Sequence, residues 1–421
     1  MPVIRNPSQD GGFRTNEVIT EPEVNFKEGK IMKYKTRGCI TAIALSAALV
    51  ISQLPAQEHS DDHRFGQKPK LIEFDPPGTG TVSSPACVPS CGTQAFANNN
   101  LGAIVGSYTD ASIVPHGFLR NPDGHILSFD APGAGLGANL NQGTVALSIN
   151  DLGVIAGQFE DPNDIFHGFV RYPDGFFTTF DAPGAGTGAN QGTIAEAVNL
   201  AGTVAGYYVD EGNVSHGFIR QRDGAILSFD APGAATGPNQ GTVVATNALN
   251  PEGAIVGWYI DADYADHGFV RVPDGTITTI DVPGAALTIV GGITPAGAIT
   301  GYSADASSVL HGFLRAPDGT ITTFDVPCGG TGPIQGTAAF KLNAARMITG
   351  PYIDASNVLH GYVRAPDGTF SKFDAPDAGT SPGQGTRPEG INQVGAVTGY
   401  YIDGGNLNHG FVWYPCNSAD K

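Results

Sequence analysis

The chain has 421 residues, of which 59 are glycine, 30 are proline and 41% are hydrophobic. This hydrophobic content, with glycines at regular places, favours ordered, turn-rich β structure over a disordered chain. The 40 acidic and 22 basic residues give a net charge of −18, and an acidic surface repels phosphate, which excludes nucleic acid as an expected partner. Glycine or proline interrupts every run long enough for a helix, so we expect an all-β fold.

The N-terminal part carries an export signal. Lys33, Lys35 and Arg37 precede an apolar, acid-free run over residues 38–54, and Ala56 offers a small residue for cleavage. A membrane span needs about 20 residues, so this run suits a signal peptide better. We expect a secreted protein, periplasmic or extracellular, without a membrane span after processing; an uncleaved anchor is the alternative.

The chain divides into five parts. Signal peptides normally begin a chain, so residues 1–31 are predicted to be a mis-annotated or disordered extension, with translation starting at Met32. The signal peptide covers 32–56 and a linker covers 57–69. The repeats occupy 70–416, and 417–421 form a tail.

Four cysteines follow the signal peptide, and export permits disulfides. Cys87 and Cys91 lie close in sequence and are predicted to bond to each other. The alternative is half of a metal site, but no second half accompanies it. The states of Cys328 and Cys416 stay open.

Internal repetition is the strongest signal. A His-Gly-Phe or His-Gly-Tyr tripeptide recurs at 44- to 51-residue intervals, beginning at His116, His167, His216, His267, His311, His360 and His409. An aspartate stands six residues before each histidine: Asp110, Asp161, Asp210, Asp261, Asp305, Asp354 and Asp403. Another stands fourteen residues after the first six histidines: Asp130, Asp181, Asp230, Asp281, Asp325 and Asp374.

Each repeat is predicted to form four short strands. In the third repeat we expect strands over 192–199, 203–209, 216–220 and 225–230, with Asp223-Gly224 in the last hairpin turn. A four-stranded unit of this length is typical of a propeller blade, so we predict a seven-bladed β-propeller. A β-solenoid is the alternative.

The two ends of the repeat region complement each other. The last repeat stops at Pro415 without a fourth strand, and Leu71–Phe74 has the sequence of that missing strand. We therefore expect the N-terminal strand to complete the last blade and close the ring.

These motifs resemble the HAF repeat, a probable extracellular repeat named for His-Ala-Phe. The shared features are the His-x-Phe start, the Asn-x-x-Gly turn and the Gly-x-Tyr strand, as in Asn392–Gly395 and Gly399–Tyr401. Glycine here replaces the family's alanine, and Arg120 and its equivalents replace an aromatic residue that Trp413 alone keeps. The resemblance covers about residues 70–415 and implies an exported protein of repeated β units; it carries no established activity.

The repeated aspartates and histidines invite a metal or acid–base interpretation. A structural one is stronger, because catalytic sites are usually singular and this set recurs in every repeat. An imidazole between two carboxylates, such as His216 between Asp210 and Asp230, forms a local hydrogen-bond network. We therefore expect no catalytic, metal or cofactor-binding residue in this set; a calcium-dependent ring using the loop aspartates is possible but unsupported.

One repeat departs from the pattern. The connection after Asp281 lacks the Thr-Gly-x-x-Gln-Gly-Thr segment, which predicts a gap near residues 285–290. Trp258, Tyr259 and Tyr264 lie on the neighbouring repeat, and an aromatic-flanked notch on an acidic surface suits a carbohydrate or a peptide. Simple variation in loop length is the alternative.

Near-identical repeats without a cofactor motif favour a non-catalytic binding or scaffold module, expected to be a monomer, whose ligand the sequence does not identify. The alternative is a secreted propeller enzyme, a lyase or a glycoside-active protein, with its site on the loop-bearing face.

Overall fold

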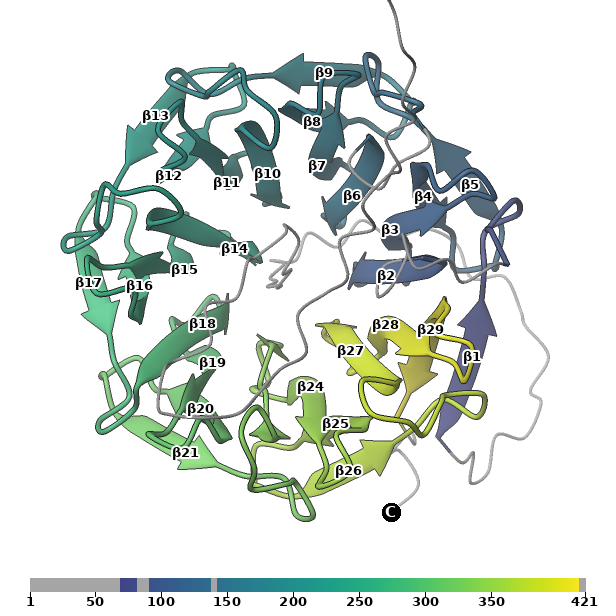
Figure 1. The fold of residues 1–421 in the computed structure, drawn as a ribbon, viewed down its shortest axis with the longest axis vertical. Coiled ribbons are helices and arrows are strands. Elements are labelled where there is room, and N and C mark those ends of the chain that lie inside the picture. The colour runs from purple at the N-terminus through teal and green to yellow at the C-terminus, as the bar shows by residue number, and fades with distance from the viewer. Residues whose placement is uncertain (1–68, 82–90, 138–141, 416–421) are drawn as a thin grey trace, which may run out of the picture. The chain divides into compact units, whose positions relative to one another are not determined.

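The computed structural model describes residues 69–81, 91–137 and 142–415, all of which belong to the compact unit Ile40–Lys421. The predicted extension at 1–31 and signal peptide at 32–56 lie outside the described residues, as do Cys87, Cys416 and the tail. Within the described part, the structure is built of strands alone and confirms the all-β prediction (Figure 1).

The strands group into successive units. The first comprises β2 (Thr93–Asn98), β3 (Ile104–Thr109), β4 (Pro115–Arg120) and β5 (Ile126–Phe129). The next two comprise β6 (Gly143–Ile149), β7 (Ile155–Glu160), β8 (Phe166–Arg171), β9 (Phe177–Phe180), and then β10 (Gly192–Val198), β11 (Val204–Val209), β12 (Ser215–Arg220), β13 (Ile226–Phe229). The following two comprise β14 (Gly241–Leu249), β15 (Ile255–Ile260), β16 (Asp266–Arg271), β17 (Ile277–Ile280), and then β18 (Leu287–Ile293), β19 (Ile299–Ala304), β20 (Leu310–Arg315), β21 (Ile321–Phe324).

The remaining strands complete the series. One unit has its first strand split into β22 (Gly336–Thr337) and β23 (Lys341–Leu342), followed by β24 (Ile348–Ile353), β25 (Leu359–Arg364) and β26 (Phe370–Phe373). The last has β27 (Gly385–Ile391), β28 (Val397–Ile402) and β29 (Asn408–Tyr414), with β1 (Lys70–Phe74) beside it. The predicted repetition of four-strand units is thus confirmed.

Each unit is an antiparallel meander. In the β10–β13 unit, Gly206 of β11 pairs with Ala195 on one side and with Phe218 on the other. A β-bulge between Ala195 and Ala197 pushes Glu196 out of the ladder. Figure 1 shows that β10 is the innermost strand of its unit and β13 the outermost. The outer strands β5, β9, β13, β17, β21 and β26 have only four residues each.

Neighbouring units touch where a first strand begins. Gly192 of β10 forms a parallel bridge with Phe166 of β8, in the preceding unit. A Cβ on Gly192 would lie 2.0 Å from the carbonyl oxygen of Phe166, and its φ is +116°, so only glycine fits. The same geometry recurs at Gly241, Gly336 and Gly385.

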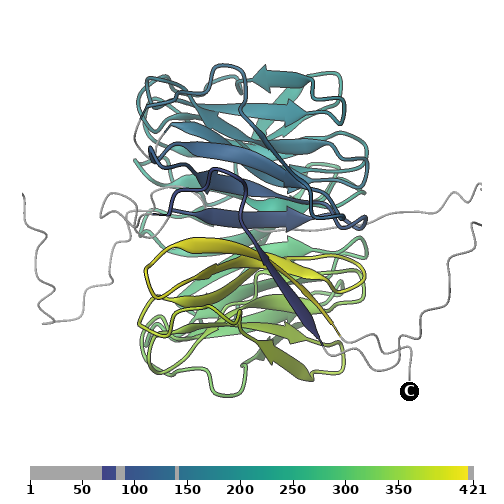
Figure 2. The same ribbon diagram turned by 90° about the vertical axis from the view of Figure 1, so that its right-hand side faces the viewer.

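Strand β1 pairs antiparallel with β29, with Leu71 opposite Trp413 and Phe74 opposite Gly410. Figure 2 shows β1, in purple, alongside the yellow strands of the last unit. The predicted partner of the first strand is therefore the observed one. Hydrogen bonds also join the last unit to the first: the Asn392 side chain donates to the Asn99 carbonyl at 3.1 Å, and the Asn408 amide donates to the Cys91 carbonyl at 2.8 Å.

The core lies between the sheets of successive units. The aromatic residue of each His-Gly-Phe or His-Gly-Tyr tripeptide is fully buried: Phe118, Phe169, Phe218, Phe269, Phe313, Tyr362 and Phe411. Several of these rings meet a ring from the fourth strand of the preceding unit edge-on, as Phe218 meets Phe180 with centroids 5.9 Å apart. Burying one such side chain contributes about 1.5–3 kcal/mol, so the tripeptide stabilises the contact between units.

Candidate functional site

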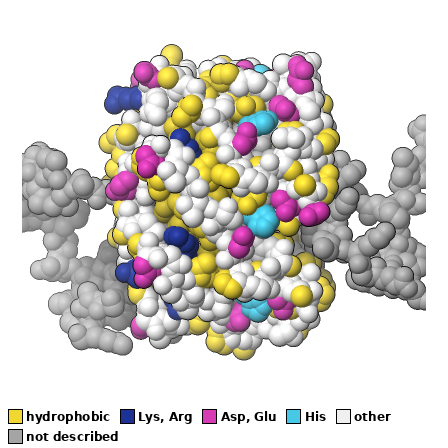
Figure 3. All heavy atoms as spheres, turned by 90° about the vertical axis from the view of Figure 1, so that its left-hand side faces the viewer, with side chains coloured by type: hydrophobic (Ala, Val, Ile, Leu, Met, Phe, Trp, Pro, Cys, Tyr) yellow, Lys and Arg dark blue, Asp and Glu magenta, His cyan; other side chains and the backbone are white. Residues whose placement is uncertain are grey.

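The structure brings together the repeated histidines and aspartates. In each repeat the histidine Nδ1 lies 2.7–3.0 Å from a carboxylate oxygen of the aspartate that follows the fourth strand. For His409 that aspartate is Asp75, which follows β1. The Nε2 atom lies 3.3–3.9 Å from the aspartate six residues earlier. Figure 3 shows imidazoles at the surface, each flanked by acidic side chains.

These contacts hold the loops of each unit. In the β10–β13 unit the Asp210 carboxylate accepts the Val214 backbone amide at 2.8 Å, and the His216 ring stacks on Tyr208 at 5.0 Å. The hydrogen bond to Asp130 raises the pKa of His116, although burial opposes it, and His167 is affected in the same way by Asp181. Each histidine is hydrogen-bonded to an aspartate of its own unit, so the repeated set does not mark one unit as a binding or catalytic site.

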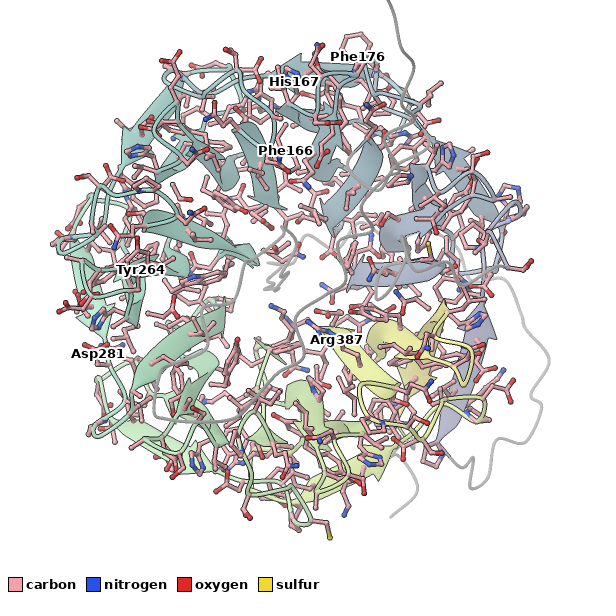
Figure 4. All side chains as sticks on the ribbon, in the orientation of Figure 1. Phe166, His167, Phe176, Tyr264, Asp281 and Arg387 are labelled. Carbon is pink, nitrogen blue, oxygen red and sulfur yellow. The ribbon has the colours of Figure 1, made fainter. Side chains whose placement is uncertain are left out.

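The three aromatic residues of the predicted notch do not come together. Tyr259 is buried, with its ring stacked on His267 at 5.0 Å. Trp258, its neighbour in β15, is partly buried and packs against the apolar cluster that contains Val256 and Val290, on the other face of the strand. Tyr264 is 50% exposed and lies in the following loop (Figure 4).

Cys91 is disulfide-bonded, but its predicted partner Cys87 lies outside the described residues, so that pairing stays a prediction. Cys328 is a free, exposed cysteine. Among the described residues, no three His, Cys, Asp or Glu side chains are grouped so as to hold a metal ion. Nor does any helix there have the length and apolar character to cross a membrane.

Another set of polar residues does not recur from repeat to repeat. Glu196, Lys341, Arg387 and Glu389, here called the inner cluster, lie on first strands, and Figure 4 shows Arg387 on the inner side of its unit. Glu196 and Glu389 both occupy the bulge of their strand. In three other units the bulge carries an apolar side chain or none: Phe96, Leu147 and Gly291. Charged residues in these positions are thus departures from the repeat.

The inner cluster links several units. Lys341 is fully buried, and its Nζ donates to the Gly291 carbonyl of the β18–β21 unit at 2.9 Å. Arg387 Nε donates to Glu389 Oε1 at 2.6 Å, and its guanidinium lies over the Phe340 ring at 5.2 Å. Glu196 accepts a hydrogen bond from Thr246 of β14.

Burial shifts the ionisation of this cluster. It raises the pKa of Glu196 well above its usual value, and the nearby Lys341 only partly opposes this. Burial likewise raises the pKa of Glu389, against the effect of Arg387, and lowers that of Lys341 well below its usual value. Glu389 Oε2 is buried and has no hydrogen-bond partner within the described structure. An unsatisfied carboxylate oxygen is costly, so a ligand donor there would be stabilising.

Two further groups extend the cluster toward the short connection. Burial raises the pKa of Tyr302 to about 12, and Arg387, Asp266 and Glu389 all act on its hydroxyl. Asp266 lies at the start of β16, where other units have Phe166, Ser215 or Leu310. Burial raises the pKa of Asp266 to about 6, although His267 opposes the shift. Ionisable groups therefore extend from the predicted notch to the inner cluster.

The recurring motifs do not reveal the inner cluster, because its charged residues are absent from most repeats. Aligning the first strands by their shared threonine would have found it: Glu196 and Glu389 stand three residues after Thr193 and Thr386, where Phe96 follows Thr93 and Leu147 follows Thr144. A charged residue at a buried repeat position is a functional signal, because isolated buried charge is costly.

No family model and no curated protein matches the chain, so the resemblance to the HAF repeat stays a prediction. Among solved structures, it is similar to AofleA from Arthrobotrys oligospora (12% identity, 83% of this chain and 91% of that one, TM-score 0.39). It is also similar to the BP39L lectin from Burkholderia pseudomallei (9%, 80% and 96%, 0.42) and to puromycin hydrolase (14%, 80% and 56%, 0.41). These TM-scores are below 0.5, so the description of the fold rests on the observed strand pairing and not on these similarities.

Proposed function

We propose that the chain forms a closed ring of seven propeller blades, in which β1 completes the last blade. Three observations support the proposal. Strand β1 pairs with β29, and Asp75, which follows β1, forms with His409 the hydrogen bond that Asp130 forms with His116. The Asn392 side chain also donates a hydrogen bond to the Asn99 carbonyl, across the junction of the last and first units. The last of these repeats the contact between Asn99 and Asn150 in consecutive units.

On this architecture we propose a non-catalytic binding module, exported to the periplasm or the exterior, with its ligand at the inner cluster. The observation that carries the proposal is the buried Glu389 oxygen without a partner, in a set of charges that the repeat does not require. The histidine and aspartate side chains already engage each other in every unit, so they serve the scaffold. We also retain the HAF-like repeat family and the predicted signal peptide as proposals.

A glycan and peptide array tests this function on the chain beginning at Gln57. We expect a ligand whose affinity falls at least about tenfold in Glu389→Gln, because the amide replaces one acceptor oxygen by a donor. Glu252→Gln is the matched control, since Glu252 is exposed in a turn. No binding on either array, or binding that both variants retain fully, would contradict the proposal.

A second function is favoured by the two inner carboxyls. Burial raises the pKa of both Glu196 and Glu389, and a raised carboxyl pKa is a property that general acid catalysis uses. The alternative is therefore a secreted lyase or glycoside-active enzyme. It predicts new chain ends from a polysaccharide, abolished separately by Glu196→Gln and Glu389→Gln. Binding without turnover would leave the binding module as the better description.

A further inference from the structure

Three contacts recur between consecutive units. On the outer side an arginine of the third strand lies over a phenylalanine of the preceding unit, as Arg271 lies over Phe229 at 5.0 Å. On the loop-bearing side a glutamine of the connection bonds to both units: the Gln240 carbonyl accepts the Ser215 amide at 2.9 Å, and its side chain donates to Asp261 at 2.8 Å. On the opposite side, asparagine side chains bond to the next unit's turn.

The junction between the β14–β17 and β18–β21 units lacks two of these contacts. Ile280 stands where other units have phenylalanine, so no aromatic ring of the described residues lies beneath Arg315. The shortened connection contains no glutamine, so nothing in it repeats the two bonds of Gln240. The bond that it does make, from the Ala286 amide to the Ala304 carbonyl, is the one that other connections also make, such as Ala235 to Ile260. Within the described strands, no bridge joins β16 to β18, and the sheet that ends at β17 is separate from the one that begins at β18. The same break lies between β4 and β6, so the missing glutamine and phenylalanine are what distinguish this junction.

On its other side the β18–β21 unit lacks one recurring contact, although its Leu310 amide donates to the Gln335 carbonyl and its Phe324 lies beneath Arg364. Thr294 replaces the turn asparagine, so it has no amide with which to repeat the Asn343-to-Asn392 hydrogen bond. What holds the junction is an apolar cluster that includes Ile280, Val282, Val290 and Ile293, together with one recurring polar contact, in which the Asn250 side chain donates to the Thr294 carbonyl at 3.3 Å. Apolar contacts are not directional, and they separate without leaving polar groups unsatisfied.

We infer that the junction between the β14–β17 and β18–β21 units opens before the other junctions, and that this opening admits a ligand to the inner cluster. The first part rests on missing contacts alone. The second rests on the proposed function and on position: Asp266 borders the junction, Tyr302 lies inward of it on β19, and Lys341 bonds to Gly291 of β18. Proteins open locally with free energies well below that of global unfolding, and binding regions are drawn from the less stable parts of a structure.

Amide hydrogen exchange, read by mass spectrometry, tests the first part. We expect amides over 286–291 to exchange at least about tenfold faster than those of the equivalent segment 241–245. Ile280→Phe restores a ring beneath Arg315 and should slow that exchange. Because the larger ring meets a buried position, a second variant replaces Leu287 with residues 236–241 of the neighbouring connection, which restores the glutamine.

The matched control creates the same defect elsewhere. Phe229→Ile removes the ring beneath Arg271, and we expect faster exchange at 241–245 while 286–291 is unchanged. Equal exchange at both junctions in the parent protein, or no response to the grafted connection, would overturn the first part.

Chemical modification of Lys341 tests the second part without any ligand. Lys341 is fully buried, so an N-hydroxysuccinimide ester of acetic acid reaches it only through an opening. We expect its acetylation to be several-fold slower in the grafted variant, with exposed Lys372 as the internal reference. Unchanged acetylation with slowed exchange would overturn the access route and leave the proposed binding function to its own test.

Discussion

Arg120 and its counterparts illustrate how one residue type serves the whole molecule. Each guanidinium that meets an aromatic ring of the preceding unit lies over it at 4.7–5.0 Å, and four of these arginines have a buried Nε without a hydrogen-bond partner within the described structure. Trp413 takes the same place in the last unit and stacks on Phe373 at 4.8 Å. The position requires a planar group that can stack on the phenylalanine ring, and both the guanidinium of arginine and the indole of tryptophan provide one.

Glu160 provides a prediction at the residue scale. Burial, and then Asp164 and Asp161, raise the pKa of Glu160 to about 8, and its Oε2 has no partner in the described part of the chain. A raised carboxyl pKa means that stability falls as the pH rises from about 4.5 to 8. Glu160→Gln should therefore gain about 4 kcal/mol over the parent at pH 8 and almost nothing at pH 4, measured by urea unfolding. An equal gain from exposed Glu252→Gln would exclude this cause.

The histidines give a second pH prediction. Hydrogen bonds to aspartate raise the pKa of His116, His167, His360 and His409. Their contribution to stability is fully present below a pH of about 6.5, and it is lost as the pH rises through the raised pKa. We expect the melting temperature to fall above about pH 6.5, and Asp130→Asn with Asp374→Asn to reduce that fall. A pH dependence identical to the parent's would contradict this origin.

At the scale of the element, most first strands have a glycine at or just before their start and a bulge near their middle; β18, which begins at Leu287, lacks the glycine. The glycine lets the strand approach the preceding unit, and the bulge turns one side chain out of the ladder. That bulge is what places Glu196 and Glu389 in the inner cluster. The same bulge places Phe96 and Leu147 in an apolar cluster in other units. The strand geometry is therefore shared by these units, and only the side chain at the bulge differs.

Gly192→Ala tests the close approach. The new Cβ would meet the Phe166 carbonyl at 2.0 Å with φ at +116°, so we expect a loss of about 3 kcal/mol or more. Gly404→Ala is the control, because a Cβ there meets nothing within 4 Å and its φ is not positive. Thermal unfolding of both variants decides the matter; equal melting temperatures would mean that the strands can move apart.

Much of each element could be predicted from its sequence pattern. The strands expected over 192–199, 203–209, 216–220 and 225–230 differ from β10–β13 by at most one residue at an end. The constant spacings also placed His216 beside Asp230, because a hairpin fixes its register. The bulges were not predictable from alternation, since a bulge breaks the two-residue period on which that reading depends. The inner cluster was missed for a different reason: its charged residues depart from the repeat, and the prediction rested on the positions that recur.

At the scale of the whole molecule, the units are tied by contacts that join each one to the next. Asn99, Asn150 and Asn199 each donate to the following turn, and Asn392 donates back to Asn99. The predicted notch shows the limit of sequence reasoning at this scale. The gap expected from the missing segment stays a prediction, and the neighbouring aromatic residues do not gather around it, because Trp258 and Tyr259 face opposite sides of one strand.

Deleting residues 69–76 tests the proposed closure. The deletion removes β1, the ring beneath Arg120, and the Asp75 partner of His409. We expect a loss of about 5 kcal/mol, which is comparable to the stability of a whole domain, seen as a large drop in melting temperature or as failure to fold. Deleting residues 57–64 is the length-matched control. A 69–76 deletion that melts like the parent would refute closure by this strand.

The brevity of the outer strands has a consequence for solubility. Every unit ends in a free sheet edge, and a long flat edge is a template on which another chain can add a strand and start a fibril. An outer strand such as β13 has four residues, with an Asp-Gly turn before it and a proline shortly after it. So short an edge offers too few backbone hydrogen bonds for another strand to pair with it. The outer strands thus leave several sheet edges unpaired, but their short length opposes aggregation through those edges.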